Sequence, residues 1–193
     1  MNKLLLGSAL LALPFAGQAS DPFQKLSAYF VNTEIEANGG EDDGSGFGIS
    51  GAARVADQAY VLGEYQSAEL DDSDVDVDQL RAGVGFHTAP AAGSPMFYGQ
   101  GEFVSIEWDD EEQDGFGVYG GILFPATEQL HLYGELGYLT LDDLDGLEFS
   151  VGGAFDITPN FGLFAEYRLA SLEDDNDDDG DLTDVKLGVS LLF

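Results

Sequence analysis

Residues 71–87 read DDSDVDVDQLRAGVGFH, an acidic run followed by a stretch in which apolar residues alternate with small or polar ones. The apolar residues of this stretch share one parity: Leu80, Ala82, Val84 and Phe86. Successive side chains of a β-strand point to opposite faces of the sheet. The segment therefore predicts a strand that has one apolar face and one small or polar face.

Acidic clusters of this kind recur along the whole chain. Five of them begin 30 to 38 residues apart: Glu41–Asp43, Asp71–Asp78, Asp109–Asp114, Asp142–Asp145 and Glu173–Asp184. Each repeat reads as strand, acidic loop, strand and turn, and repetition of a single unit indicates a repetitive architecture. We therefore predict an all-β fold, a closed antiparallel up-and-down barrel that carries most of its charge at one rim.

Ten segments have the expected alternation, although a barrel of eight strands is an alternative. We place the strands at 25–36, 46–55, 59–70, 77–87, 96–108, 115–124, 130–141, 147–156, 161–172 and 183–193. They are ten to thirteen residues long, close to the ~9–11 residues of a tilted membrane-spanning strand.

Alternation alone does not separate a membrane barrel from a soluble barrel with an inward apolar face. Here the connections after odd-numbered strands are acidic, whereas those after even-numbered strands contain few acids. Four prolines fall in the latter connections: Pro90, Pro95, Pro125 and Pro159. The two rims therefore face different environments. This asymmetry favours a transmembrane barrel with short periplasmic turns and acidic extracellular loops.

The composition limits the other classes of protein. The chain has 193 residues and a net charge of -31, yet 44% of its residues are hydrophobic, which is too many for a disordered acidic chain. The clusters hold 24 of the 37 Asp and Glu residues. There is no cysteine, so no disulfide stabilises the fold. The negative charge disfavours nucleic acid as a partner.

The first residues have the pattern of a secretory signal peptide. A basic Lys3 precedes an apolar stretch, and small residues stand before a cleavage position after Ala19. We therefore expect a signal peptide over residues 1–19 and a barrel domain over residues 20–193. The export signal and the barrel pattern together predict a location in the cell outer membrane.

A glutamate recurs in four strands, and an acidic residue follows each of these glutamates by seven positions. The four are Glu64, Glu102, Glu135 and Glu166. Their parity is opposite to that of the apolar face, so they are predicted to point into the barrel at one height. A charge facing hydrocarbon would cost several kcal/mol.

Four cations share the inward parity of these glutamates: Arg54, Arg81, Arg168 and Lys186. Buried carboxylates require partners, so we predict a network of Glu, Arg and Tyr side chains in the lumen. Inward glycines such as Gly48 and Gly85 would leave space for the long side chains of neighbouring strands. The network either fills and fixes the barrel or lines a narrow polar path.

These features resemble the small outer-membrane β-barrels of Gram-negative bacteria, the OmpA-like barrels of the porin superfamily. The resemblance rests on the signal peptide, the alternating strands, residues 71–79 with the following Gly83-Val84-Gly85-Phe86, and the terminal Phe193. It implies that Val185–Phe193 is recognised by the barrel-assembly machinery. It also implies a monomer that is in contact with outer-membrane lipids and lipopolysaccharide.

One acidic cluster partly matches a calcium-binding loop. Asp175, Asp177 and Asp179 precede Gly180 with the spacing of a D-x-D-x-D-G sequence, but Lys186 stands where the closing glutamate is expected. A solvated acidic loop fits the same residues. We expect no required cofactor, and weak capture of Ca²⁺ or Mg²⁺ by the acidic loops.

Catalysis is not expected. The only histidines, His87 and His131, lie near the predicted turns and far from the acidic rim, whereas nucleophilic hydrolysis needs a base beside the nucleophile. The leading hypothesis is a surface or envelope-stabilising barrel without enzymatic activity. A narrow cation-preferring, porin-like channel and a calcium-dependent adhesion or binding module remain alternatives.

Overall fold

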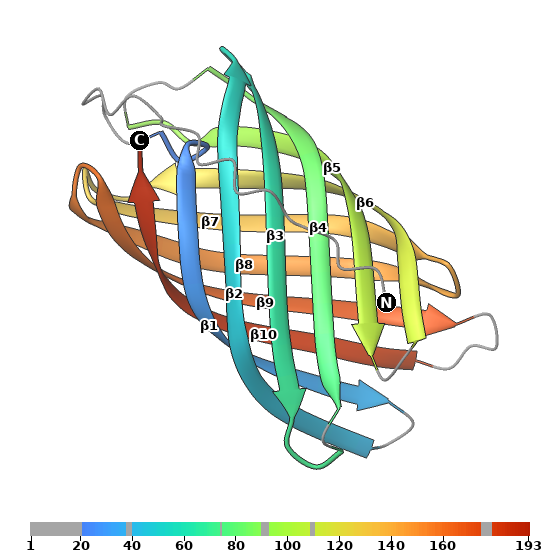
Figure 1. Cartoon of the computed structure of the whole chain (residues 1–193). Coiled ribbons are helices and arrows are strands. Elements are labelled where there is room, and N and C mark those ends of the chain that lie inside the picture. The colour runs from blue at the N-terminus through green and yellow to red at the C-terminus, as the bar shows by residue number, and fades with distance from the viewer. Residues whose placement is uncertain (1–20, 38–39, 74, 90–92, 109–110, 175–178) are drawn as a thin grey trace, which may run out of the picture.

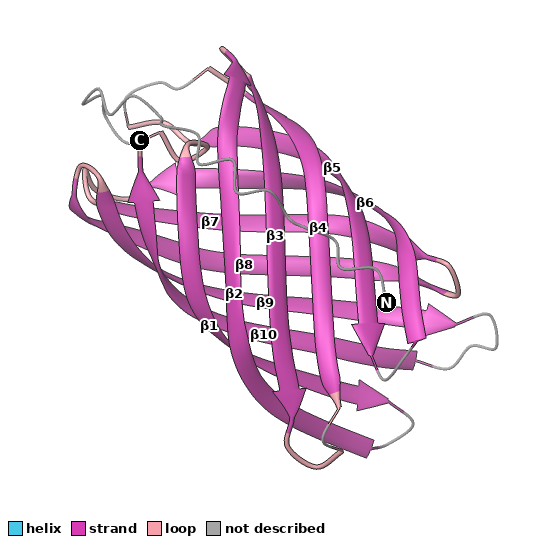
Figure 2. Ribbon diagram, viewed as in Figure 1, coloured by secondary structure: helices cyan, strands magenta, loops and turns pink. Residues whose placement is uncertain are grey.

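The computed structural model describes residues 21–37, 40–73, 75–89, 93–108, 111–174 and 179–193. Almost all of them lie in ten strands (Figures 1 and 2). The strands are β1 (Lys25–Ala37), β2 (Gly40–Ala56), β3 (Ala59–Leu70), β4 (Asp76–His87), β5 (Met96–Trp108), β6 (Glu111–Pro125), β7 (Leu130–Leu141), β8 (Leu144–Thr158), β9 (Phe161–Asp174) and β10 (Asp179–Leu192). The predicted signal peptide lies outside the described residues.

The strands form one closed antiparallel barrel in which each strand pairs with its neighbours in sequence and β1 pairs with β10. The closing pair runs from Lys25 opposite Leu192 to Ala37 opposite Gly180. Closure leaves no sheet edge, so no row of backbone N–H and C=O groups is left unpaired. The prediction of ten strands is confirmed, and the alternative of eight is wrong.

The two ends of the barrel differ. We call the end with the β1–β2, β3–β4, β5–β6, β7–β8 and β9–β10 hairpins the loop end, and the opposite end, where the C-terminus lies, the turn end (Figure 1). The strands at the loop end are longer than predicted. For example, β2 has 17 residues and β8 has 15. Acidic residues such as Glu41 and Asp181 therefore lie on paired strands and not in loops, because an outward carboxylate does not interfere with the backbone ladder.

The exterior of the barrel carries an apolar band. Its members are large, solvent-exposed side chains of the predicted apolar parity, among them Phe47 (73% exposed), Val118 (70%), Phe86 (66%) and Leu187 (58%). An apolar surface on every strand of a closed barrel is the signature of contact with hydrocarbon. The fold is therefore a transmembrane β-barrel.

No helix among the described residues is long and apolar enough to cross a membrane.

Tyrosines mark the edge of the apolar band on the side of the loop end. The hydroxyl of Tyr65 donates to Asp78 Oδ1 at 3.1 Å, and the hydroxyl of Tyr138 donates to Asp145. Both rings lie on the outer face, 44% and 48% exposed. Aromatic rings with one apolar side and one hydrogen-bonding tip favour the boundary between lipid and water.

Beyond this boundary, toward the loop end, the outer face becomes polar and the inner face becomes apolar. On β5, Phe97 and Phe103 point outward among apolar neighbours, but the next outward residues are Ser105 and Glu107. The inward residues change in the opposite sense, from Gln100 and Glu102 to Val104, Ile106 and Trp108. Inward apolar side chains from six strands then form a buried cluster: Leu70, Val77, Val104, Ile106, Leu139, Leu141, Ala170, Leu172 and Leu182.

Inside the membrane-spanning part, tyrosine rings lie over inward glycines of adjacent strands, as the sequence predicted. A Cβ added to Gly48 would stand 2.3 Å from the Tyr29 ring, and one added to Gly85 would stand 2.2 Å from the Tyr60 ring. Gly121 and Gly152 are covered in the same way by Tyr98 and Tyr133. These glycines have no room for a side chain, which fixes the rotamers of the tyrosines.

The exterior band predicts a position-dependent cost for a charge. We expect Val118→Arg to lower the free energy of unfolding by about 2–4 kcal/mol, because it places a cation in hydrocarbon. Ser171→Arg, on the outer face of β9 beyond the band, should change it by less than about 1 kcal/mol. Urea unfolding in phosphatidylcholine vesicles measures both. Equal costs for the two variants would place the membrane boundary elsewhere.

The tyrosine and glycine pairs predict a second contrast. Gly85→Ala should lower the free energy of unfolding by about 1–3 kcal/mol, because the added Cβ overpacks against Tyr60. Gly120→Ala is the matched control, since a Cβ at Gly120 meets no atom within 4 Å. The same unfolding assay applies, and Tyr60→Leu in the Gly85→Ala background should recover part of the loss. A neutral Gly85→Ala variant would show that the ring does not press on this glycine.

Candidate functional site

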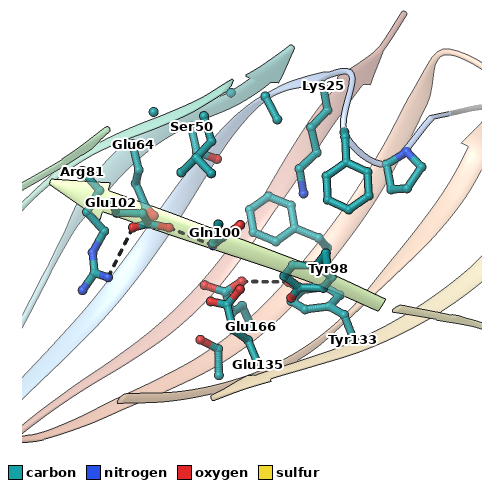
Figure 3. Close-up of a pocket in the computed structure, with 18 of the residues that line it drawn as sticks. Lys25, Ser50, Glu64, Arg81, Tyr98, Gln100, Glu102, Tyr133, Glu135 and Glu166 are labelled. Atoms are coloured by element: carbon teal, nitrogen blue, oxygen red, sulfur yellow. Dashed lines mark hydrogen bonds and ion pairs between the residues drawn. The ribbon is translucent and has the colours of Figure 1, made fainter. Parts of the chain in front are cut away.

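The four repeated glutamates converge on one cavity inside the barrel. Glu64, Glu102, Glu135 and Glu166 all line a chamber of about 190 Å³ in the lumen, and Figure 3 shows them pointing toward one another from separate strands. The outward neighbours Tyr65, Leu136 and Tyr167 are exposed on the wall. The structure therefore places these glutamates at the positions that the parity argument predicted.

Tyrosine hydroxyls and a lysine complete this chamber. Tyr133 donates to Glu166 Oε2 at 2.9 Å, and Tyr98 donates to Glu135. Gln100 donates to Glu102 Oε1 at 2.8 Å. Lys25 extends into the same space (Figure 3). The chamber can hold water, because both hydrogen-bond donors and acceptors line it.

Toward the loop end, a polar network closes the chamber. Its members are Glu64, Gln66, Gln79, Arg81, Glu148, Arg168, Asp184 and Lys186. Arg168 lies at its centre. Its guanidinium donates to Asp184 Oδ2 at 2.7 Å, to Gln66 Oε1 at 3.2 Å and to Gln79 Oε1 at 3.1 Å.

One of these bonds crosses the barrel at its full width. Arg168 is on β9 and Gln79 is on β4, and these strands stand five places apart in the ring of ten. No larger separation exists in such a ring. The side chains of the network therefore meet across the lumen and do not only coat its wall.

Arg81 makes the second crossing. Its Nη1 and Nη2 donate to both carboxylate oxygens of Glu148 at 2.8 and 2.7 Å, a bidentate pair between β4 and β8. Nη1 also lies 3.8 Å from Glu102 and donates to the Tyr119 hydroxyl at 3.1 Å. Arg81 and Glu148 are 3% and 2% exposed. Two buried charges of opposite sign in this geometry compensate each other.

Lys186 joins the network to the chamber. Its ammonium group bonds to Glu64 and lies 3.3 Å from Glu166 Oε1. Tyr29 donates to the same Glu64 carboxylate. Three of the four predicted cations, Arg81, Arg168 and Lys186, are thus in contact with predicted glutamates.

The structure places Arg54 apart from this network, contrary to the prediction. It lies at the turn end of β2, where its Nη1 is 3.0 Å from Asp21 Oδ2 and its side chain is 38% exposed. Parity gives the face on which a residue lies but not its height along the barrel. The irregular register after Arg54 also ends the regular pairing of β2 with β3 there.

The same region contains a contact that the sequence did not indicate. Phe23, which precedes β1, enters the turn end of the lumen and is 7% exposed. Its ring stacks on Tyr60 and on His87, with ring centroids 4.3 and 4.7 Å apart. His87 is thereby buried in an aromatic stack, and His131 lies 3.3 Å from Asp156.

Several members of the network were missed from sequence. Asp184 was assigned to an acidic loop cluster, but it is 1% exposed and accepts bonds from Arg168, Gln66 and Thr33. Glu148, Gln66 and Gln79 were not selected either. Parity was the available signal, since Asp184 and Glu148 alternate with the apolar residues Val185 and Leu147. The acidity of the surrounding segment concealed it.

The structure does not describe all three of the predicted metal ligands. Asp175 and Asp177 lie outside the described residues, while Asp179 begins β10 at the loop end. Among the residues that the structure does describe, no group of three or more His, Cys, Asp or Glu side chains is arranged to hold a metal ion.

One carboxylate at the loop end joins two hairpins. Asp42 accepts the backbone N–H groups of Asp72 and Ser73 at 3.0 and 3.1 Å. A hydrogen bond from the Ser73 side chain, together with these two backbone bonds, lowers the pKa of Asp42. The charged form of this rim residue is therefore favoured by the fold.

Comparison with solved structures gives outer-membrane barrels. An outer membrane channel from Pseudomonas putida F1 is 8% identical, with 95% of this chain and 100% of that chain covered and a TM-score of 0.50. Neisserial surface protein A is 16% identical, with 88% and 96% covered and a TM-score of 0.49. KdgM porin is 11% identical, with 86% and 99% covered and a TM-score of 0.45.

No protein-family model matches the sequence, and no curated protein matches it. At these identities the structural similarity shows the fold alone. The class defined by the structure is a closed ten-stranded transmembrane β-barrel with a polar, internally paired lumen.

The bidentate pair across the lumen predicts a large effect of a small change. Glu148→Gln should lower the free energy of unfolding by about 3–5 kcal/mol, because it leaves the Arg81 guanidinium buried without its compensating charge. Arg81→Met combined with Glu148→Leu should lower it less, since both charges of the bidentate pair are then removed together and only the longer Arg81–Glu102 contact is lost. Urea unfolding in vesicles measures both variants. A double variant as unstable as Glu148→Gln would contradict this account.

Proposed function

We propose that this protein resides in the outer membrane as a closed barrel that stabilises the envelope surface and performs no catalysis. The observation that carries the proposal is the polar network, whose Arg168–Gln79 and Arg81–Glu148 contacts cross the lumen. Gln66, Gln79, Asp184 and Glu148 are 2% exposed or less. At the height of this network, the side chains of the barrel itself occupy the lumen.

The alternative function, a narrow cation-preferring channel, is favoured by the charge of the lumen. Six described carboxylates line it (Glu64, Glu102, Glu135, Glu148, Glu166 and Asp184), and four described cations accompany them (Lys25, Arg81, Arg168 and Lys186). An excess of acids in a pore favours cations. The closed network and the Phe23 stack oppose a continuous path.

The orientation and the partners follow from the rims. We place the loop end at the cell surface and the turn end in the periplasm. The acidic strands at the loop end would then attract Ca²⁺ or Mg²⁺ and share these ions with lipopolysaccharide phosphates. The protein would act as a monomer, assembled through recognition of Val185–Phe193. A calcium-dependent adhesion role would use the same acidic rim.

Planar-bilayer recording separates the two functions. The native chain should give no steady conductance steps, because the network blocks the lumen. A variant with Arg81, Glu148, Arg168 and Asp184 replaced by Ser and Phe23 replaced by Ala removes two cations, two anions and the aromatic stack at the turn end, and it should conduct. Ser105→Ala with Ser171→Ala, on the outer wall, is the silent control. Steady cation-selective steps from the native chain would instead support the channel.

A further inference from the structure

The interior of the loop end contains a second cavity, separate from the polar chamber. It has a volume of about 450 Å³. Its wall is made chiefly of apolar side chains: Ile35, Leu70, Val75, Val77, Ile106, Trp108, Leu144, Leu172 and Leu182. We call this space the apolar cup. The polar network lies toward the turn end of it.

The apolar cup is not required by the membrane. At its height the outer wall carries Asp76, Glu107 and Ser171, so this part of the barrel stands in water. Here the barrel has the distribution of a soluble ligand-binding barrel, with polar residues outside and apolar residues inside. Barrel closure needs only the backbone ladder and would tolerate polar inward side chains.

The cavity, which is open at the loop end, has the size of a ligand site. Protein interiors are close-packed, and voids larger than a water molecule are few. Ligand sites typically have volumes of about 300–1,000 Å³ and mostly apolar walls. Water is bound poorly in an apolar cavity, so an apolar molecule that displaces it gains free energy.

The rim of the cup selects by charge. Glu36, Asp179 and Asp181 stand around its opening on outward-parity positions, and the described residues that line the cup include no Lys or Arg. Carboxylates in this position repel an anionic ligand and accept a neutral or cationic one. Anionic amphiphiles are therefore poor candidates for the occupant.

We propose that the apolar cup is a binding site for a small, largely hydrocarbon molecule that carries no negative charge. The site is separate from the polar lumen. The proposal therefore does not depend on whether the lumen is closed or conducts ions. The molecule would enter from the loop end and pack against Trp108, Ile106 and Leu172. The three rim carboxylates would exclude anions of the same shape.

The chain provides its own reporter, because Trp108 is its single tryptophan and lines the cup. The test uses the full barrel in phosphatidylcholine nanodiscs and two probes with one skeleton. N-phenyl-1-naphthylamine is neutral, and 1-anilinonaphthalene-8-sulfonate carries a negative charge. Energy transfer from Trp108 to the neutral probe should saturate, with empty nanodiscs as the background. At low salt the anionic probe should bind about fivefold more weakly.

Two sets of variants locate the site. Gly180→Phe fills the cup, and a Cβ at Gly180 meets only ordinary contacts at 3.5 and 3.8 Å. This variant should bind the neutral probe with about tenfold lower affinity. Thr183→Phe, of outward parity on the same strand, is the matched control and should leave the affinity for the neutral probe unchanged. The combined variant Glu36→Gln, Asp179→Asn and Asp181→Asn should raise the affinity for the anionic probe and leave the affinity for the neutral probe unchanged.

Three results would overturn the proposal. The first is energy transfer that never saturates above the nanodisc background. The second is saturable transfer that Gly180→Phe leaves unchanged while its heat-modifiable gel mobility shows a folded barrel. The third is equal affinity for the two probes at low salt, which would remove the selection by charge.

Discussion

The structure depends on closure of the sheet between β1 and β10. In hydrocarbon a backbone N–H or C=O without a partner costs several kcal/mol, so a spanning sheet must have no edge. The pairing of Lys25–Ala37 with Gly180–Leu192 removes the only two edges that the chain would otherwise have. Once the ring is closed, every inward side chain shares one narrow interior, and every outward side chain faces lipid or water.

The contents of the interior follow from that confinement. Charges placed inside cannot reach bulk water freely, so they must find opposite charges or hydrogen bonds across the lumen. Arg81 and Arg168 do this with partners four or more strands away, which makes the network a brace between opposite walls. On the turn-end side of the network, tyrosine rings over glycines fill the lumen. On its loop-end side, the surroundings of the outer wall change from lipid to water, and the inner wall becomes apolar.

Much of this could be predicted from the sequence, and the part that could not has a physical cause. Glu64, Glu102, Glu135 and Glu166 were placed inside because a charge on the lipid face is costly, and the structure has them there. Arg54 had the same parity but lies at the turn end beside Asp21. Asp184 was hidden among acids of the loop end, although its parity is inward. Parity is a local property, whereas height in the barrel depends on where the strand enters the membrane.

The sequence by itself therefore determined the barrel class, the apolar and polar faces of most strands and the end that carries the charge, and it favoured ten strands over eight. These follow from a two-residue period and from the spacing of the acidic clusters, which the chain displays without reference to its neighbours. Only the tertiary structure decided which side chains meet, and that the loop end encloses an apolar cavity. Contacts across a barrel are set by the stagger between strands distant in sequence, and no local pattern records that stagger.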